Sequence, residues 1–353
     1  MAMEARCEEA QSGIPGRDGF RSGRHLRRPC RHSGNQTLPF LATLLVRRTP
    51  TPVKSVAKLA AVLVVLIGGL ELGLRVTGSI LTQRAMADLA RQAGDGPIVL
   101  AIGESTTAGL DVDPGDSYPR QLQRMLRKHY SNPSIRVVAP YAMGQNSSQQ
   151  LNRLPGYLEA LEPELVLLMC GVNNPWSFVE SNIIDFIDDS DPVARRIRLR
   201  KLLDRSRVVK LARLGLIDLS YALEDLRGGA ERERWPPPSW LIDWSGQQRE
   251  AFLALWRSDV TAMIASIRDA GGEALLMTYP SYEFPPVSEF EALAAETGAP
   301  LVRVDEAFRK ALRRRQTSEL FLEDGYHPTA RGYGLLAHQV YLYITTHDSL
   351  DLD

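Results

Sequence analysis

A serine lies in a glycine-rich turn directly after the first strand expected in the chain. The turn spans residues 103–109, with the sequence GESTTAG, and follows the apolar run Pro97–Ile102. In an open α/β sheet, ligands bind at the carboxyl ends of the strands, so Ser105 is a candidate nucleophile there. Taken alone, the turn also fits a phosphate-binding loop or an ordinary turn. It does not follow the G-x-S-x-G pattern, because residue 107 is threonine.

A histidine near the other end of the chain can supply the base that a serine needs. A hydroxyl is a poor nucleophile near neutral pH, whereas imidazole has a pKa close to working pH. His327 follows Asp324 by three residues and precedes Pro328, at the start of the last expected helix. The Asp324 carboxylate can hold the imidazole tautomer and stabilise the imidazolium. The other histidines fall in the leader, at a helix end, inside the last helix or in the tail: His25, His32, His129, His338 and His347.

Acyl chemistry also needs donors for the negative charge that develops on the carbonyl oxygen. Gly144, after the second expected strand, can offer its backbone N–H without a side chain in the way. Asn173, after the third, can offer its amide, and the backbone N–H of Ser105 is a third donor. The segment around Asn173 also fits an ordinary Asn-Gly turn.

Alternating apolar runs and helical patterns indicate the elements that position these residues. Strands are expected at Pro97–Ile102, Ile135–Ala139, Glu164–Cys170, Glu273–Tyr279 and Leu301–Val304. Helices are expected at Ser117–His129, Ser147–Leu161, Gln247–Ala270, Glu289–Glu296 and Thr329–Thr346. Continuously apolar strands that alternate with helices predict a parallel sheet covered on both faces. We therefore expect a three-layer α/β/α sandwich with five parallel strands.

The order Ser, Gly, Asn, Asp/His resembles the SGNH/GDSL hydrolase family. The blocks of that family correspond here to residues 103–109, Gly144, Gly171–Asn174 and Asp324–Pro328. The resemblance covers residues 97–346 apart from an insertion, and it implies a flavodoxin-like fold. Glu104 and Asn174 depart from the family pattern, which has aspartate at both positions.

This resemblance implies a serine ester hydrolase that needs no metal or cofactor. Ser105 would attack the ester carbonyl, Asp324 and His327 would complete the triad, and Ser105, Gly144 and Asn173 would form the oxyanion hole. Two alternatives stay open, namely an O-acyltransferase that modifies envelope polysaccharide and a non-catalytic envelope binding module. A nucleotide-binding domain is disfavoured, because neither G-x-G-x-x-G nor a P-loop lysine follows the first strand.

An apolar segment precedes the α/β region. The run Leu59–Leu70 reaches about 20 residues when extended to Ser55–Leu74, which is the length of a membrane span. We favour an uncleaved anchor within residues 51–80 over a cleaved signal peptide or a buried helix. Basic residues before the run predict a cytoplasmic N-terminus, and hence a single-pass inner-membrane protein with a periplasmic catalytic domain. Residues 1–50, rich in Arg, Gly, Ser and Pro, are expected to be a disordered basic leader.

The hydrolase domain is expected over residues 95–348, with an insertion at residues 175–245 that does not fit the strand-helix rhythm. Between Arg195 and Arg213 the insertion carries nine Lys or Arg residues and one acid, with apolar residues between them. It is either a helical insertion with a solvated basic face, or a lid that shapes the acyl pocket or rests on anionic lipid. The stretch Trp235–Trp244 is either a rim for sugar or lipid or a packed loop.

Charge and cysteine content give no support for a nucleic-acid-binding, disulfide-rich or zinc-binding protein. Lys and Arg together number 42, as do Asp and Glu, so net charge gives no argument for a nucleic acid partner. Cys7 and Cys30 lie in the leader and Cys170 in an apolar run, a spacing that suggests neither a disulfide framework nor a zinc site. Cys170 is expected to be a buried filler.

Overall fold

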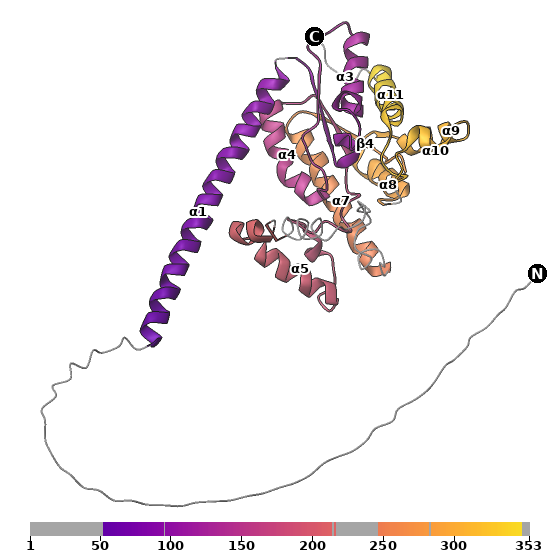
Figure 1. The fold of residues 1–353 in the computed structure, drawn as a ribbon. Coiled ribbons are helices and arrows are strands. Elements are labelled where there is room, and N and C mark those ends of the chain that lie inside the picture. The colour runs from indigo at the N-terminus through magenta and orange to yellow at the C-terminus, as the bar shows by residue number, and fades with distance from the viewer. Residues whose placement is uncertain (1–51, 95, 214, 217–245, 282–283, 348–353) are drawn as a thin grey trace, which may run out of the picture. The chain divides into compact units, whose positions relative to one another are not determined.

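The computed structural model describes residues 52–347, except residues 95, 214, 217–245 and 282–283 (Figure 1). The expected leader and the stretch Trp235–Trp244 lie outside the described residues. The chain divides into two units, Met1–Val56 and Ala57–Asp353, and all of the strands belong to the second unit.

The first described element is a single long helix, α1 (Pro52–Ala93). Within the described residues, its range Val56–Arg91 is the one helix long and apolar enough to cross a membrane, and its apolar stretch is not buried. An export signal passes the same test of length and composition. Near the end of the helix, Met86 and Leu89 pack against the main hydrophobic core.

Five parallel strands form one sheet in the order β2-β1-β3-β4-β5, which confirms the expected α/β fold. The strands are β1 (Ile98–Gly103), β2 (Arg136–Val138), β3 (Leu165–Met169), β4 (Glu273–Met277) and β5 (Leu301–Val302). The three central strands are almost wholly buried, which is why their sequences are continuously apolar. Gly103 at the end of β1 pairs with Met169 at the end of β3, so the loops after these strands leave the sheet side by side.

Helices cover both faces of the sheet. One layer contains α3 (Tyr118–His129), α9 (Val304–Leu312), α10 (Thr317–Leu320) and α11 (Ala330–His347). The other contains α4 (Ser147–Leu161), α7 (Gly246–Asp269) and α8 (Val287–Thr297). Right-handed crossovers place α3 and α4 on opposite faces, because the chain crosses the sheet in opposite directions before and after β2. Figure 1 shows α3 beside α11.

The expected last strand is too long. The strand β5 ends at Val302, because Arg303 is the N-cap of α9 and Val304 is the first residue of that helix. Val304 and Phe308 are both fully buried and lie four residues apart, on one face of that helix.

The described part of the insertion packs on α7 through a small core of its own. It contains the 3-10 turn η2 (Ile183–Asp185), the helix α5 (Pro192–Leu203) and helical residues 207–213. Asn146 secures the chain where the insertion begins. Its Oδ1 caps α4 by accepting the N–H of Gln149, and its Nδ2 donates to the carbonyls of Ser177 and Val179, at 2.7 and 2.9 Å.

Candidate active site

The structure brings Ser105, His327 and Asp324 into one chain of hydrogen bonds. Ser105 is the first residue of the short helix α2 (Ser105–Ala108), two residues after the end of β1. Its Oγ lies 2.7 Å from Nε2 of His327, which is 222 positions away in sequence. The other ring nitrogen of His327, Nδ1, lies 2.5 Å from Oδ2 of Asp324. A base within hydrogen-bond reach of a hydroxyl, itself oriented by a carboxylate, is the arrangement that activates a serine.

The loop that carries His327 also fixes the carboxylate. Oδ1 of Asp324 accepts the backbone N–H groups of Tyr326 and His327, at 2.8 and 2.9 Å. Burial raises the pKa of Asp324, but hydrogen bonds from the His327 side chain and from these two N–H groups outweigh it and lower the pKa overall. Asp324 is therefore ionised at neutral pH, the state that can stabilise an imidazolium.

One side of this group is open to water. The side chain of His327 is 15% exposed and that of Asp324 is 40% exposed. Solvent therefore reaches the polar end of the hydrogen-bond chain in the described structure, and a water molecule can approach without a large rearrangement.

The two other predicted donors lie in neighbouring loops. Gly144 is exposed and has a φ of 69°, in the left-handed region where glycine is favoured. Asn173 donates from Nδ2 to the carbonyl of Gln145, at 3.0 Å, so its amide lies against the turn that contains Gly144. The Asn173 amide group carries a second N–H, which can serve a developing oxyanion.

A tryptophan orients that amide. Nε1 of Trp176 donates to Oδ1 of Asn173 at 2.7 Å. Because an indole N–H can only donate and a carbonyl can only accept, the bonds to Trp176 and Gln145 together determine which end of the amide carries the hydrogens. The sequence does not indicate Trp176, since nothing in its local pattern marks it as a partner of Asn173.

Glu104, the first departure from the family pattern, joins three strand ends. It is buried, and its carboxylate accepts the N–H of Gly171 and the hydroxyl of Tyr279, both at 2.6 Å. The Tyr279 hydroxyl in turn accepts the N–H of Val172, at 3.2 Å. Burial raises the pKa of Glu104 to about 7, although the bonds from Tyr279 and Gly171 act in the opposite direction. Glu104 thus links the loop that carries Asn173 to the turn that carries Ser105.

Asn174, the second departure, belongs to a buried polar network. Its Oδ1 accepts the N–H of Ser147 and its Nδ2 donates to the Ser147 hydroxyl, both at 2.8 Å. The hydroxyls of Ser147 and Ser148 donate to the same oxygen of Asp259, at 2.6 and 2.7 Å. Burial raises the pKa of Asp259. An amide suits position 174 because it both donates and accepts, whereas a second carboxylate would lie one serine away from Asp259.

No metal-binding arrangement of three or more His, Cys, Asp or Glu side chains occurs within the described ranges. Cys170 is buried, and burial raises the pKa of its thiol well above the ordinary value, so it is not a reactive thiolate.

A parallel α/β sheet with Ser, His and Asp hydrogen-bonded at its carboxyl edge is typical of an ester hydrolase. The sequence profile of the GDSL-like lipase/acylhydrolase family matches residues 101–335, and the chain belongs to this family. It is an enzyme of the ester-hydrolysing kind.

Several solved structures are similar to the chain. The psychrotrophic esterase EstA from Pseudoalteromonas sp. is 18% identical, with a TM-score of 0.40 over 70% of this chain and 97% of that chain. The acetylxylan esterase Axe2 from Geobacillus stearothermophilus is 18% identical, with a TM-score of 0.43 over 71% and 95%. A lipase/acylhydrolase from Enterococcus faecalis is 15% identical, with a TM-score of 0.42 over 73% and 98%. No curated protein sequence matches the chain.

Proposed function

We propose that this chain is a membrane-anchored serine ester hydrolase that acts on O-acyl esters outside the cytoplasm. The observation that carries the proposal is the unbroken hydrogen-bond chain from Ser105 through His327 to Asp324. Family membership supplies the reaction type, and the three side chains supply the roles that this reaction needs.

In the proposed reaction, Oγ of Ser105 forms a bond to the ester carbonyl carbon as Nε2 of His327 takes its proton. Asp324 stabilises the imidazolium. The negative charge on the carbonyl oxygen is held by the N–H groups of Ser105 and Gly144 and by the amide of Asn173. His327 then protonates the departing alkoxide, and a water molecule, deprotonated by the same imidazole, releases the acyl group from the serine.

The exposure of the site favours water as the final acceptor. An acyltransferase must keep water away from the acyl-enzyme, whereas Asp324 is 40% exposed. We therefore propose hydrolysis ahead of acyl transfer. The helix α1 supports action on envelope material, such as O-acetylated polysaccharide, peptidoglycan or lipid esters, because an uncleaved anchor would keep the enzyme at the membrane.

Labelling of the nucleophile tests the proposal. Full-length protein in membranes is treated with a fluorophosphonate probe, and turnover is measured on p-nitrophenyl acetate and p-nitrophenyl octanoate. We expect Ser105→Ala to abolish both labelling and turnover, and Ser190→Ala, which removes an exposed serine of the insertion, to change neither. Turnover by Ser105→Ala equal to that of the wild type would reject the assignment. The ratio of the two esters reports the acyl length that the site accepts.

A second measurement tests the location. Protease is added to intact spheroplasts, and the catalytic domain is followed by immunoblot. Digestion is expected if the domain lies outside the inner membrane. Complete protection in intact spheroplasts, followed by digestion after lysis, would reject the proposed orientation.

A further inference from the structure

The insertion exposes five leucines. Five leucines between residues 199 and 216 are 46–66% exposed, on α5 and on the helical residues that follow it. They are Leu199, Leu202, Leu203, Leu211 and Leu216. Other residues of the same segment, such as Ile197, are buried in the small core on α7, so the segment is folded and these leucines face outward from it. We call this group, together with the basic residues around it, the leucine-arginine surface.

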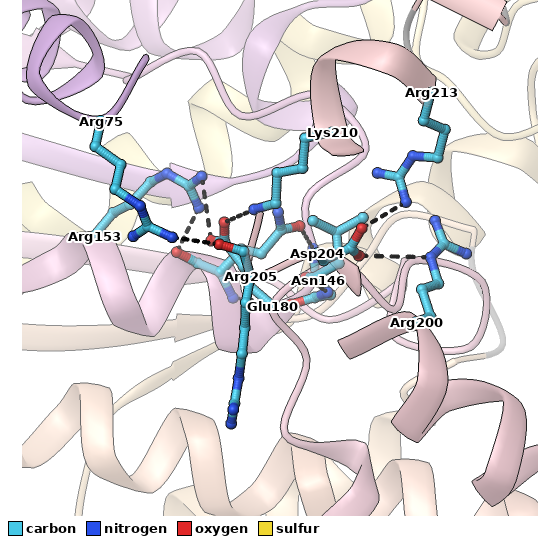
Figure 2. Close-up of polar contacts among 11 residues, drawn as sticks. Arg75, Asn146, Arg153, Glu180, Arg200, Asp204, Arg205, Lys210 and Arg213 are labelled. Atoms are coloured by element: carbon cyan, nitrogen blue, oxygen red, sulfur yellow. Dashed lines mark hydrogen bonds and ion pairs between the residues drawn. The ribbon is translucent and has the colours of Figure 1, made fainter. Parts of the chain in front are cut away.

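The surface is strongly basic. Residues 195–213 contain nine Lys or Arg and one acid, Asp204. Asp204 is already engaged by Arg213 at 2.8 Å and lies 3.7 Å from Arg200 (Figure 2). A surface with exposed leucines and unneutralised cations fits an apolar layer edged by negative charge. Within the described part of the chain, five cations of this segment have no ion pair: Arg195, Arg196, Lys201, Arg205 and Arg207.

Two residues of α1, Glu71 and Arg75, bind this segment by hydrogen bonds. Glu71 accepts the Ser206 hydroxyl at 2.9 Å and the N–H of Val208 at 3.0 Å, and thereby caps the start of helical residues 207–213. Arg75, one turn further along α1, donates to the carbonyl of Arg205 at 2.6 Å (Figure 2).

Glu180, near the start of the insertion, links the segment to the α/β domain. Glu180 pairs with Lys210 at 3.1 Å and lies 3.7 Å from Arg153 of α4 (Figure 2). The leucine-arginine surface is therefore tied to both α1 and the α/β domain.

Glu71, which binds the segment, is also the residue at which the uncharged run of α1 ends. No charged residue lies between Lys58 and Glu71. The 12 uncharged residues 59–70 span about 18 Å as a helix. Extended back to Val53, past Lys58 and Lys54, whose long side chains can reach the interface, the stretch spans about 27 Å, close to the roughly 30 Å of a bilayer core. If this stretch crosses the membrane, Glu71 and Arg75 lie in the head-group layer, and the segment that they hold lies there too.

We propose that the leucine-arginine surface docks on the bilayer that α1 crosses, with the leucines at the acyl boundary and the arginines on anionic lipid phosphates. Arginine binds phosphate through its planar fork of donors, and basic residues gain affinity for anionic lipid near the surface. This inference rests on the membrane anchoring in the proposed function.

A lipid-quenching experiment on the full chain tests the docking. In a background with Cys7→Ser and Cys30→Ser, Leu202→Cys is labelled with nitrobenzoxadiazole and reconstituted into vesicles of phosphatidylglycerol and brominated phosphatidylcholine. The matched control is Leu342→Cys, an exposed leucine of α11. We expect roughly threefold quenching at position 202 and little at 342, since a docked residue lies about 5–10 Å into the head-group boundary.

The charges are tested in the same vesicles. Arg195→Gln with Arg196→Gln is expected to reduce quenching at position 202, whereas Arg313→Gln with Arg314→Gln, an exposed pair outside the insertion, is not. Equal quenching at 202 and 342 would overturn the proposal, as would a blue-shifted label that lipid does not quench, because protein would then cover the surface. Flotation with the vesicles is measured first. Failure to float would reject the anchoring itself, whereas flotation without quenching would reject only the docking.

Discussion

Replacing the buried carboxyl of Glu104, next to Ser105, should change how the stability of the protein depends on pH. Glu104 has a pKa of about 7 in the folded protein, against an ordinary value of 4.5, because burial opposes its ionisation. The folded state thus retains its proton to a higher pH than the unfolded state does. The contribution of Glu104 to stability is therefore greatest below pH 4.5, falls as pH rises toward 7, and is constant above that.

The size of the effect follows from the two pKa values. At 1.36 kcal/mol per pH unit, the difference between 4.5 and about 7 corresponds to about 3 kcal/mol of unfolding free energy. Glu104 is fully buried, so solvent screening does not reduce this figure as it would at the surface. In Glu104→Gln the amide oxygen can still accept the N–H of Gly171, but the group no longer titrates. The variant should lack about 3 kcal/mol of the pH dependence of the wild type.

The assay is chemical denaturation of the detergent-solubilised full chain at several values between pH 4.5 and pH 8. The quantity of interest is the difference in unfolding free energy between Glu104→Gln and the wild type, because other groups, such as Asp259, also titrate with raised pKa values. Glu159→Gln, which removes an exposed carboxyl of α4, is the control and should run parallel to the wild type. If Glu104→Gln also runs parallel to the wild type, the carboxyl is not held protonated by burial and the reasoning fails.

Two further variants probe the site directly. Asp324→Asn should fold normally, by circular dichroism, but lower kcat between about 10²- and 10⁴-fold, because the imidazole loses the carboxylate that orients it; an unchanged kcat would contradict the role of Asp324. Trp176→Phe should lower kcat about tenfold with little change in KM, because the amide of Asn173 is no longer oriented toward an oxyanion. An effect on KM alone would show that Trp176 contacts substrate instead.

The fold was largely predictable because its strands are buried on both faces. No polar residue interrupts the apolar runs at β1, β3 and β4, so the sequence indicates buried strands there without ambiguity. The helix α9 was missed, since its first residue, Val304, is again apolar after Arg303 and looks like a further residue of β5.

The site was predictable only in part. Ser105 and His327 could be paired from their chemistry and from the element that each follows. The contact of Glu104 with Tyr279 joins residues 175 positions apart, and no spacing in the chain indicates it. The same holds for Asp259, whose partners are two ordinary serines at the start of a helix. Buried polar partners of this kind are set by tertiary packing and not by local pattern.

Asn146 has a consequence for how this enzyme can diversify. Its amide holds the carbonyls of Ser177 and Val179, just downstream of the loop that carries Asn173. The loop that carries Asn173 is thereby fastened within the first residues of the insertion. Exposed positions beyond Val179, such as Ser190 and Leu199, can be substituted without moving the groups that would hold the oxyanion, whereas Ile183 is fixed by its packing in the small core on α7. Changes at these exposed positions can therefore alter what the insertion presents to a substrate while the loop that carries Asn173 stays in place.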